Sequence, residues 1–265
     1  CQMCPQTNPG RHKGFLKQMK LDEFEKYVMQ CVDKGVKVVN LEGSGEATLI
    51  RRLPEYIQIL TDNNIKSYIF SNGFKFKGNL MNRNAFDFVK NNAIKAQEYI
   101  SQTNGVTEIA SYHLITDNNQ LDYEIEEYKK NWIEPTGTLA EIWKMHNWSG
   151  VYENPNERAG NVKTCGRPFA PEITIRAGGL DGKTGAIHPC CQVLGRDEEA
   201  VLGHLSESTF EEVWNGKAYQ ELREGHITGN YPSYCKGCDF LIDYTNHNRS
   251  VHTLPGTDFT LESFR

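Results

Sequence analysis

Eight cysteines are the residues most able to do chemistry in this chain of 265 residues. Four of them form two C-x-x-C pairs, Cys1 with Cys4 and Cys235 with Cys238. Two thiolates on one tight loop can reach a single metal centre, so this spacing is typical of zinc and iron–sulfur sites. The alternative is a set of disulfides, which is more common in small secreted domains than in a chain of this length. We therefore expect metal or cluster ligation.

Three more cysteines lie in the C-terminal part of the chain, ahead of the second pair. They are Cys165, Cys190 and Cys191. Four thiolates from such a group suit either a tetrahedral zinc ion or an iron–sulfur cluster, because both take four cysteine ligands. The cysteines therefore predict a metal centre in this part and leave its metal open at this point.

A glycine-rich segment, Gly43-Ser44-Gly45-Glu46, follows a run of β-branched residues. Its two glycines let a ligand approach the backbone closely, and the Glu46 carboxylate can accept a hydrogen bond from a cationic amine. In a parallel barrel this segment would lie at the carboxyl end of a strand, where active sites form. Taken alone, it is better explained as an ordinary turn between a strand and a helix.

Helices and strands alternate through the first part of the chain. The spacing of apolar residues predicts helices over residues 21–34, 51–63, 85–101 and 121–133. It predicts strands over residues 36–39, 106–115 and 138–145, and a further strand that begins at Lys66. This alternation predicts βα units with parallel strands and a TIM-like or partial barrel. Cys31 falls on the apolar face of the first helix, so we expect it to be a small buried residue rather than a ligand.

The character of the sequence changes near residue 150, where the segment NPNERAGNVK is typical of a loop. We place a domain boundary there, with a barrel over residues 1–150 and a second domain over residues 151–265. In the second domain, residues 172–176 and the segment AIHPCC predict a β-hairpin. Residues 207–224 predict a helix that is interrupted at Asn215-Gly216.

In combination, the N-terminal motifs resemble those of the radical SAM superfamily. Its hallmark is a C-x3-C-x2-C loop after the first barrel strand and a G-G-E-P-like motif after the second. Cys1 and Cys4 match the last two cysteines of that loop, so the first cysteine and the first strand are expected upstream, and the chain is expected to be truncated at its N-terminus. Gly43–Glu46 matches the second motif, with Ala47 where proline is usual. Ser71-Asn72-Gly73 is similar to the Thr/Ser-Asn-Gly that ends the next strand.

The resemblance implies two cofactors in this half. Cys1 and Cys4 would bind a 4Fe–4S cluster whose open iron is chelated by S-adenosylmethionine. Gly43, Ser44, Gly45 and Glu46 would hold the methionine amino group, with Ser71 and Asn72 as further cofactor-binding residues. Reduction would then release a 5′-deoxyadenosyl radical that abstracts a substrate hydrogen, chemistry that belongs to the cofactor. No catalytic residue is assigned.

The C-terminal motifs resemble the SPASM/twitch extension of radical SAM enzymes. Several segments follow one another in the order that is usual in this family. They are the start Cys165-Gly166-Arg167-Pro168-Phe169, the turn from Gly185 to Cys190-Cys191, the segments 203–205 and 212–216, and the final C-x-x-C. The shorter, twitch form implies one auxiliary 4Fe–4S cluster, held by Cys165, Cys190, Cys235 and Cys238. Cys190 is preferred to Cys191 because the family spacing from Gly185 ends on it. Tetrahedral zinc is the rival.

The fold class is therefore expected to be α/β, a partial (β/α)6 radical SAM barrel followed by a small α+β twitch domain. The barrel is expected to be incomplete, because only FKFKGNLMNRN separates Ser71-Asn72-Gly73 from the next helix. The auxiliary cluster implies oxidation of a small polar substrate such as a sugar or aminocyclitol, as in the aminocyclitol dehydrogenases of the family. The alternatives are a maturase that cross-links or epimerises a ribosomal peptide and, outside the class, a zinc-binding module without catalysis.

Partners and location follow from composition and resemblance. The net charge of −5 argues against a generic nucleic-acid or membrane-surface binder. No apolar run approaches the roughly 18 residues of a membrane span. The resemblance implies a flavodoxin- or ferredoxin-like electron donor. Because such clusters are sensitive to oxygen, the protein is expected to be located in the reducing cytoplasm.

Other polar residues are weaker candidates. His113, Glu141 and His146-Asn147-Trp148 lie on or after predicted strands, where they could meet cofactor or substrate or serve only as wall and cap residues. Arg167 and Arg176 could bind an anionic group, although a structural ion pair is the simpler expectation.

Overall fold

The computed structural model describes residues 15, 17–42, 45–71, 85–115, 118–144, 146–151, 164–239 and 241. Cys1, Cys4, Gly43, Ser44 and Asn72 lie outside the described residues. The chain divides into two compact units, the first formed by residues 1–71, 147–153 and 160–242 and the second by residues 72–146, 154–159 and 243–265. The predicted boundary near residue 150 stays a prediction. Among the described residues, no helix combines the length and the apolar content of a membrane span.

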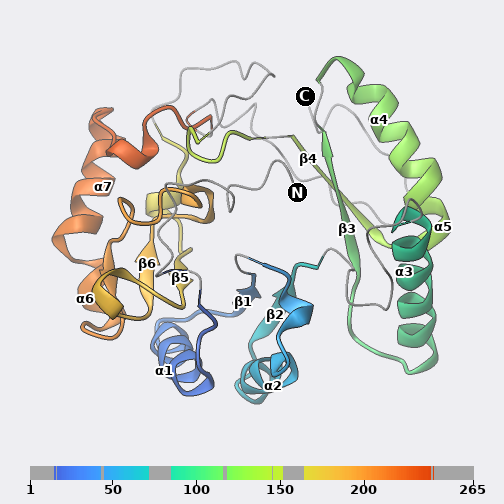
Figure 1. Cartoon of the computed structure of the whole chain (residues 1–265), viewed down its shortest axis with the longest axis horizontal. Helices are drawn as coiled ribbons and strands as arrows, with labels where there is room; N and C mark the ends of the chain where they lie inside the picture. Colours follow the sequence, from blue (N-terminus) through green and yellow to red (C-terminus); the bar gives the residue numbers. More distant parts are fainter. Residues whose placement is uncertain are drawn as a thin grey trace. The chain divides into compact units, whose positions relative to one another are not determined.

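The first unit begins with alternating helices and strands (Figure 1). They are α1 (Leu21–Val32), β1 (Val38–Leu41), α2 (Leu53–Asp62) and β2 (Lys66–Ile69). The two strands are parallel, with Val38 opposite Lys66, so α2 is the crossover that parallel pairing requires. Phe24 and Tyr56 pack ring edge to face between the two helices. The predicted helices and strands of this region are confirmed.

The second unit has the same βα order. Its elements are α3 (Ala85–Gln102), β3 (Ala110–Ile115), α4 (Leu121–Tyr128), a π-helical segment (Lys129–Ile133), α5 (Glu134–Thr136) and β4 (Leu139–Lys144). β3 and β4 are parallel, and Ile115, Ile125 and Ile142 form a buried core between strand and helix. The single helix predicted over residues 121–133 is corrected, because the backbone changes to π-helical hydrogen bonding after Tyr128.

In the parts of the chain that the structure describes, β1–β2 and β3–β4 are separate parallel pairs and do not join into a closed barrel. Each pair has the parallel pairing expected of an α/β fold. The partial (β/α)6 barrel stays a prediction.

The C-terminal part of the first unit contains a small antiparallel sheet and two helices. The sheet has the order β5 (Thr174–Arg176), β6 (Ala186–His188) and β7 (Gly203–His204), followed by α6 (Phe210–Trp214) and α7 (Lys217–Thr228). The predicted hairpin is β5–β6, and the predicted break falls between α6 and α7. A Cβ atom on Gly216 would lie 2.7 Å from the Glu212 carbonyl oxygen, which explains why glycine stands at the break.

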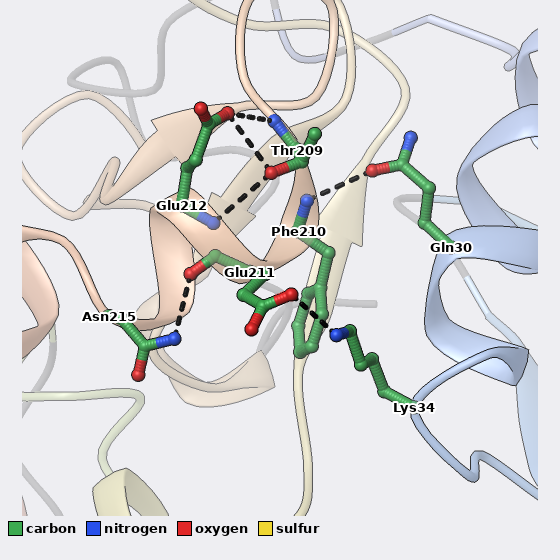
Figure 2. Close-up of polar contacts among 7 residues, drawn as sticks. All are labelled: Gln30, Lys34, Thr209, Phe210, Glu211, Glu212 and Asn215. Atoms are coloured by element: carbon green, nitrogen blue, oxygen red, sulfur yellow. Dashed lines mark hydrogen bonds and ion pairs between the residues drawn. The ribbon is translucent and has the colours of Figure 1, made fainter.

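Helix α1 packs against α6 within this unit (Figure 2). The Phe210 backbone N–H donates to Gln30 Oε1 at 2.9 Å, and Lys34 Nζ pairs with Glu211 Oε2 at 2.5 Å. The Tyr27 hydroxyl lies 2.7 Å from the Thr184 hydroxyl. The first helix of the α/β part is therefore anchored to the small antiparallel domain.

The start of α6 carries a capping box (Figure 2). The Thr209 hydroxyl accepts from the Glu212 N–H at 3.2 Å, and Glu212 Oε2 accepts from the Thr209 N–H at 2.8 Å. The bond from the Thr209 N–H, together with one from the Thr209 hydroxyl at 3.0 Å, holds the pKa of the Glu212 carboxyl below its usual value. We expect Thr209→Ala to lower the free energy of unfolding by about 1 kcal/mol, because orphan N–H groups of the helix lose their acceptor. Urea unfolding followed by circular dichroism measures this, and Ser208→Ala, which leaves the box intact, should change stability by much less.

Candidate metal centre

Four predicted ligands come from three separate stretches of the first unit. Cys165 precedes the helical turn Arg167–Phe169, and Cys190 follows β6. Cys235 ends the helical turn Ser233–Cys235, with Cys238 in the loop after it. All four are half-buried, and among the described residues no two cysteines form a disulfide.

These four thiols influence one another's ionisation. Burial raises the pKa of Cys190 well above its usual value, and negative charge on Cys191 and Cys238 raises it further. Burial raises the pKa of Cys235 to about 12, with contributions from Cys165 and Cys238. The interactions thus connect Cys165 to Cys235, Cys235 to Cys238, and Cys238 to Cys190. That these four thiols ligate one auxiliary cluster stays a prediction.

One wall of this group of thiols is apolar. Cys190 and Cys235 pack against a core that includes Ile187, Tyr219 and Tyr234. Burial raises the pKa of both tyrosines, and negative charge on Cys190 adds to the shift. With raised pKa values these thiols are neutral when no metal is bound, and a bound metal or cluster would supply the positive charge that lets them ionise and ligate. Soft thiolates favour iron–sulfur clusters or zinc over hard cations.

Cys191 has a different environment from its neighbour. Its sulfur accepts hydrogen bonds from Arg167 Nη1 at 3.8 Å and from Gln192 Nε2 at 3.6 Å. Burial raises the pKa of Cys191, Arg167 opposes this, and negative charge on Glu42, at the end of β1, adds to it. The thiol is thus engaged by side chains outside the four-thiol group. The preference for Cys190 as the ligand stays a prediction.

Both arginine candidates make ion pairs. Arg167 Nη1 donates to Glu172 Oε1 at 2.7 Å, and Arg176 Nε lies 3.6 Å from Oδ1 of the buried Asp197. Asp197 also accepts from the Gly195 N–H at 3.2 Å, so it ties β5 to the loop after Cys191. The simpler expectation, a structural ion pair, describes both arginines.

The turn after β4 holds the loop that carries the last two cysteines, a contact that the sequence analysis missed. Asn147 Nδ2 donates to the Gly237 carbonyl at 2.7 Å. The Asn147 N–H donates to Asp239 Oδ2 at 2.9 Å, and the Asp239 N–H returns a bond to Asn147 Oδ1 at 3.2 Å. The Ser149 hydroxyl donates to the Tyr234 carbonyl. The sequence analysis left two roles open for His146-Asn147-Trp148, contact with a cofactor or substrate and a structural cap. Asn147 has the structural role.

We expect Asn147→Ala to loosen this loop without unfolding the domain. Its amide bonds contribute about 1–2 kcal/mol, so a cluster bound at Cys235 and Cys238 should be lost to a chelator about 5–30 times faster. Iron release measured by absorbance would show this. Asn215→Ala is the matched control, because Asn215 Nδ2 bonds only the Glu211 carbonyl of its own helix end (3.1 Å, Figure 2). Equal rates in the two variants would contradict the prediction.

The cofactor-binding candidates are described only in part. Glu46 Oε1 accepts from the Thr48 N–H at 3.2 Å and from the Thr48 hydroxyl at 2.6 Å, which caps the short turn Ala47–Leu49. Gly45 has open space where a side chain would be. Ser71 lies two residues beyond the end of β2 and is exposed. That these residues bind a cofactor stays a prediction, and so does cofactor binding by Gly43, Ser44 and Asn72.

The remaining candidates fit structural roles. His113 Nε2 lies 3.1 Å from Glu124 Oε2, and its ring stacks on Tyr128. Glu141 and His146 are buried. Cys31 is buried in α1 and its pKa is raised to about 11 by desolvation, as expected of a small core residue. In the described part of the chain, no three His, Cys, Asp or Glu side chains converge on a point that could hold a single metal ion.

Comparison with known proteins defines the class of the C-terminal part. Residues 182–239 match the family model of SPASM, described as an iron–sulfur cluster-binding domain. This range contains Cys190, Cys191, Cys235 and Cys238. Residues 182–239 are therefore similar to iron–sulfur cluster-binding domains of the SPASM type.

The whole fold is similar to a crystal structure of BtrN in complex with AdoMet and 2-DOIA. The TM-score is 0.50 at 13% sequence identity, over 84% of this chain and 80% of BtrN. None of the curated proteins compared with the chain matches it in sequence. The likeness to BtrN concerns the fold, and the SPASM match concerns residues 182–239. Both support the expected resemblance to radical SAM enzymes with a C-terminal SPASM domain.

Proposed function

We propose that the chain is a radical SAM enzyme that oxidises a small polar substrate, such as a sugar or an aminocyclitol, with the help of an auxiliary 4Fe–4S cluster. The observation that carries the proposal is a group of four half-buried thiols, of which Cys190, Cys235 and Cys238 lie in the segment that matches the SPASM cluster-binding domain. The likeness of the whole fold to BtrN supports the enzyme class.

Residues of this chain have distinct tasks in the proposed site. Cys165, Cys190, Cys235 and Cys238 hold the auxiliary cluster, which when bound supplies one-electron chemistry. The apolar wall that includes Tyr219 and Tyr234 keeps water from the sulfurs on that side.

The proposed cofactor site lies at the carboxyl ends of the first strands. Cys1 and Cys4 would help to hold a cluster that binds S-adenosylmethionine. Gly43, Ser44, Gly45 and Glu46 receive the methionine amino group, and Ser71 and Asn72 complete the contacts. The Glu46 carboxylate orients the amine by a charge-assisted hydrogen bond. To accept this bond, Glu46 has to give up the hydrogen bond that it accepts from the Thr48 hydroxyl.

The substrate class is proposed by analogy with the structure of BtrN, which is a complex with AdoMet and 2-DOIA. A flavodoxin- or ferredoxin-like protein is the proposed electron donor, and a reducing cytoplasm the proposed location. A maturase acting on a ribosomal peptide would use the same cofactors, so turnover has to separate the two.

The test begins with protein purified and reconstituted under anaerobic conditions. Iron, sulfide and zinc contents are measured together with an electron paramagnetic resonance spectrum, and 5′-deoxyadenosine is quantified after incubation with S-adenosylmethionine and a reductant. Iron and sulfide in equal amounts, with 5′-deoxyadenosine formation stimulated by aminocyclitols or amino sugars, would support the proposal. Stoichiometric zinc with negligible iron would contradict it, and stimulation only by a ribosomal peptide would assign the maturase.

A further inference from the structure

Cys165 is the proposed cluster ligand that lies outside the segment matching the SPASM family, on a turn of its own (residues 164–169, the Cys165 turn). Gly166 has a φ of +78°, and the Phe169 N–H donates to the Gly166 carbonyl at 3.0 Å. These features set the shape of the turn but not its place beside the other ligands. That place has to come from contacts with the rest of the first unit, and helix α7 packs against the turn.

His226 of α7 bonds the residues on either side of Cys165. Its Nδ1 lies 3.0 Å from the Thr164 hydroxyl, and the same hydroxyl accepts from the Gly166 N–H at 3.0 Å. His226 is 2% exposed, and within the described part of the chain its Nε2 has no hydrogen-bond partner. A buried nitrogen without a partner costs free energy that an apolar side chain of similar size would avoid. The bond to Thr164 is therefore what a histidine adds at this position.

Arg223, three positions before His226 and on the same face of α7, bonds the far end of the Cys165 turn. Its Nε donates to the Pro168 carbonyl at 3.1 Å, and its Nη1 donates to the Trp214 carbonyl at the end of α6 at 2.8 Å. The guanidinium also lies over the rings of Trp214 and Tyr219, 4.5 and 4.7 Å from their centroids. Both acceptors are main-chain carbonyls, so this side chain fixes the backbone of the turn relative to the two helices.

The same helix also receives the chain that leads to Cys235. A Cβ atom on Gly225 would lie 2.7 Å from the Asn230 carbonyl oxygen and 3.2 Å from Pro232 Cδ. The glycine therefore lets the segment before the turn Ser233–Cys235 approach α7 closely. Two of the three stretches that carry the proposed ligands thus pack against one helix.

We propose that Arg223 and His226 are positioning residues that hold the Cys165 turn against α7, so that the Cys165 sulfur is in place to ligate the auxiliary cluster. His226 acts through the Thr164 hydroxyl, and Arg223 acts through the Pro168 carbonyl. The inference deepens the proposed function and rests on it, because it requires a cluster at these cysteines.

The test uses the full chain, reconstituted under anaerobic conditions. Two properties of the auxiliary cluster are measured, the rate of iron release to a chelator and the g values of the reduced cluster, which respond to the surroundings of its ligands. His226→Gln moves the polar atoms to the place of Nε2, and Thr164→Val removes the hydroxyl. Both should release iron about 5–30 times faster and shift the g values. His226→Asn keeps a polar atom at the place of Nδ1 and should restore most of the original behaviour.

Arg223→Lys separates the position of the turn from the charge. Lysine keeps the positive charge but has one nitrogen in place of the two that bond Pro168 and Trp214. Iron release from Arg223→Lys should therefore be about as fast as from Arg223→Met. His204→Gln is the matched control, because the His204 Nε2 accepts from the Leu180 N–H at 3.1 Å and not from the Cys165 turn. This variant should leave the g values unchanged.

The outcomes separate this inference from the proposed function. Absence of a second cluster in the unaltered protein would overturn both. A second cluster with the same g values and iron release in all variants would overturn the inference alone, and equal effects of asparagine and glutamine at position 226 would overturn the role of Nδ1. Full retention by Arg223→Lys would assign Arg223 a role through its charge and overturn its role in positioning. Where a His226 variant does not fold, Thr164→Val removes the same hydrogen bond from the other side, and Thr164→Ser, which keeps the hydroxyl, should rescue it.

Discussion

Replacing both Cys235 and Cys238 by alanine is expected to remove about four irons and about four inorganic sulfides per chain. The paramagnetic signal of one cluster should disappear, while the signal that responds to S-adenosylmethionine remains. The reason is that the loop then supplies no sulfur, so the auxiliary cluster loses two of its four proposed ligands. Elemental analysis and the electron paramagnetic resonance spectrum of the reduced protein measure the effect.

Two single variants serve as matched controls for this loss. Cys31→Ala removes a thiol buried in α1, so it should retain all the iron. Cys191→Ala should also retain it, because the Cys191 sulfur is engaged by Arg167 and Gln192. Cys190→Ala should lose the cluster. If instead Cys191→Ala loses the iron and Cys190→Ala keeps it, the ligand assignment is wrong and the adjacent cysteine takes the position.

The elements that the sequence predicts well are those specified by local spacing. The β5–β6 hairpin and the break before α7 follow from a glycine-rich turn and from Asn215-Gly216, each readable within a few residues. The C-x-x-C spacing likewise identifies Cys235 and Cys238 as a pair. These features need no knowledge of distant contacts, because short-range backbone geometry decides them.

The contacts that complete the site are not local, and sequence reasoning misses them. Asn147 bonds to Gly237 and Asp239 across about ninety positions of the chain. Arg196 reaches Ser149 across a separation of 47. An asparagine in a loop or an arginine beside a glutamate gives no signal of such a role, since both are common on protein surfaces. The predicted barrel likewise depends on long-range pairings. The described strands form the parallel pairs β1–β2 and β3–β4, and the barrel stays a prediction.

The contact between α1 and the segment that matches the SPASM family leads to the second prediction with a large expected effect. Gly185 has a φ of +67°, and a Cβ atom there would lie 2.7 Å from the Tyr27 ring and 2.9 Å from Leu205 Cβ. Tyr27 is buried against the core, so the ring has little room to move. Gly185→Ala should therefore cost about 1–2 kcal/mol for the left-handed backbone and a further 1–3 kcal/mol, roughly, for overpacking. The free energy of unfolding, measured by urea denaturation, should fall by the sum.

Gly182 separates the two causes, since it lies in the same turn with a φ of +78° and has nothing within 4 Å of the position that a Cβ atom would take. Gly182→Ala should cost only the backbone part, about 1–2 kcal/mol. Replacing Tyr27 by leucine in the Gly185→Ala background should recover part of the packing loss, because the smaller side chain relieves the overlap. Equal destabilisation by both alanines, without recovery, would show that Gly185 is required only for its backbone angle. Unequal losses would show that the glycine preceding the cluster cysteines is also needed for the close approach of α1 to the domain that binds the cluster.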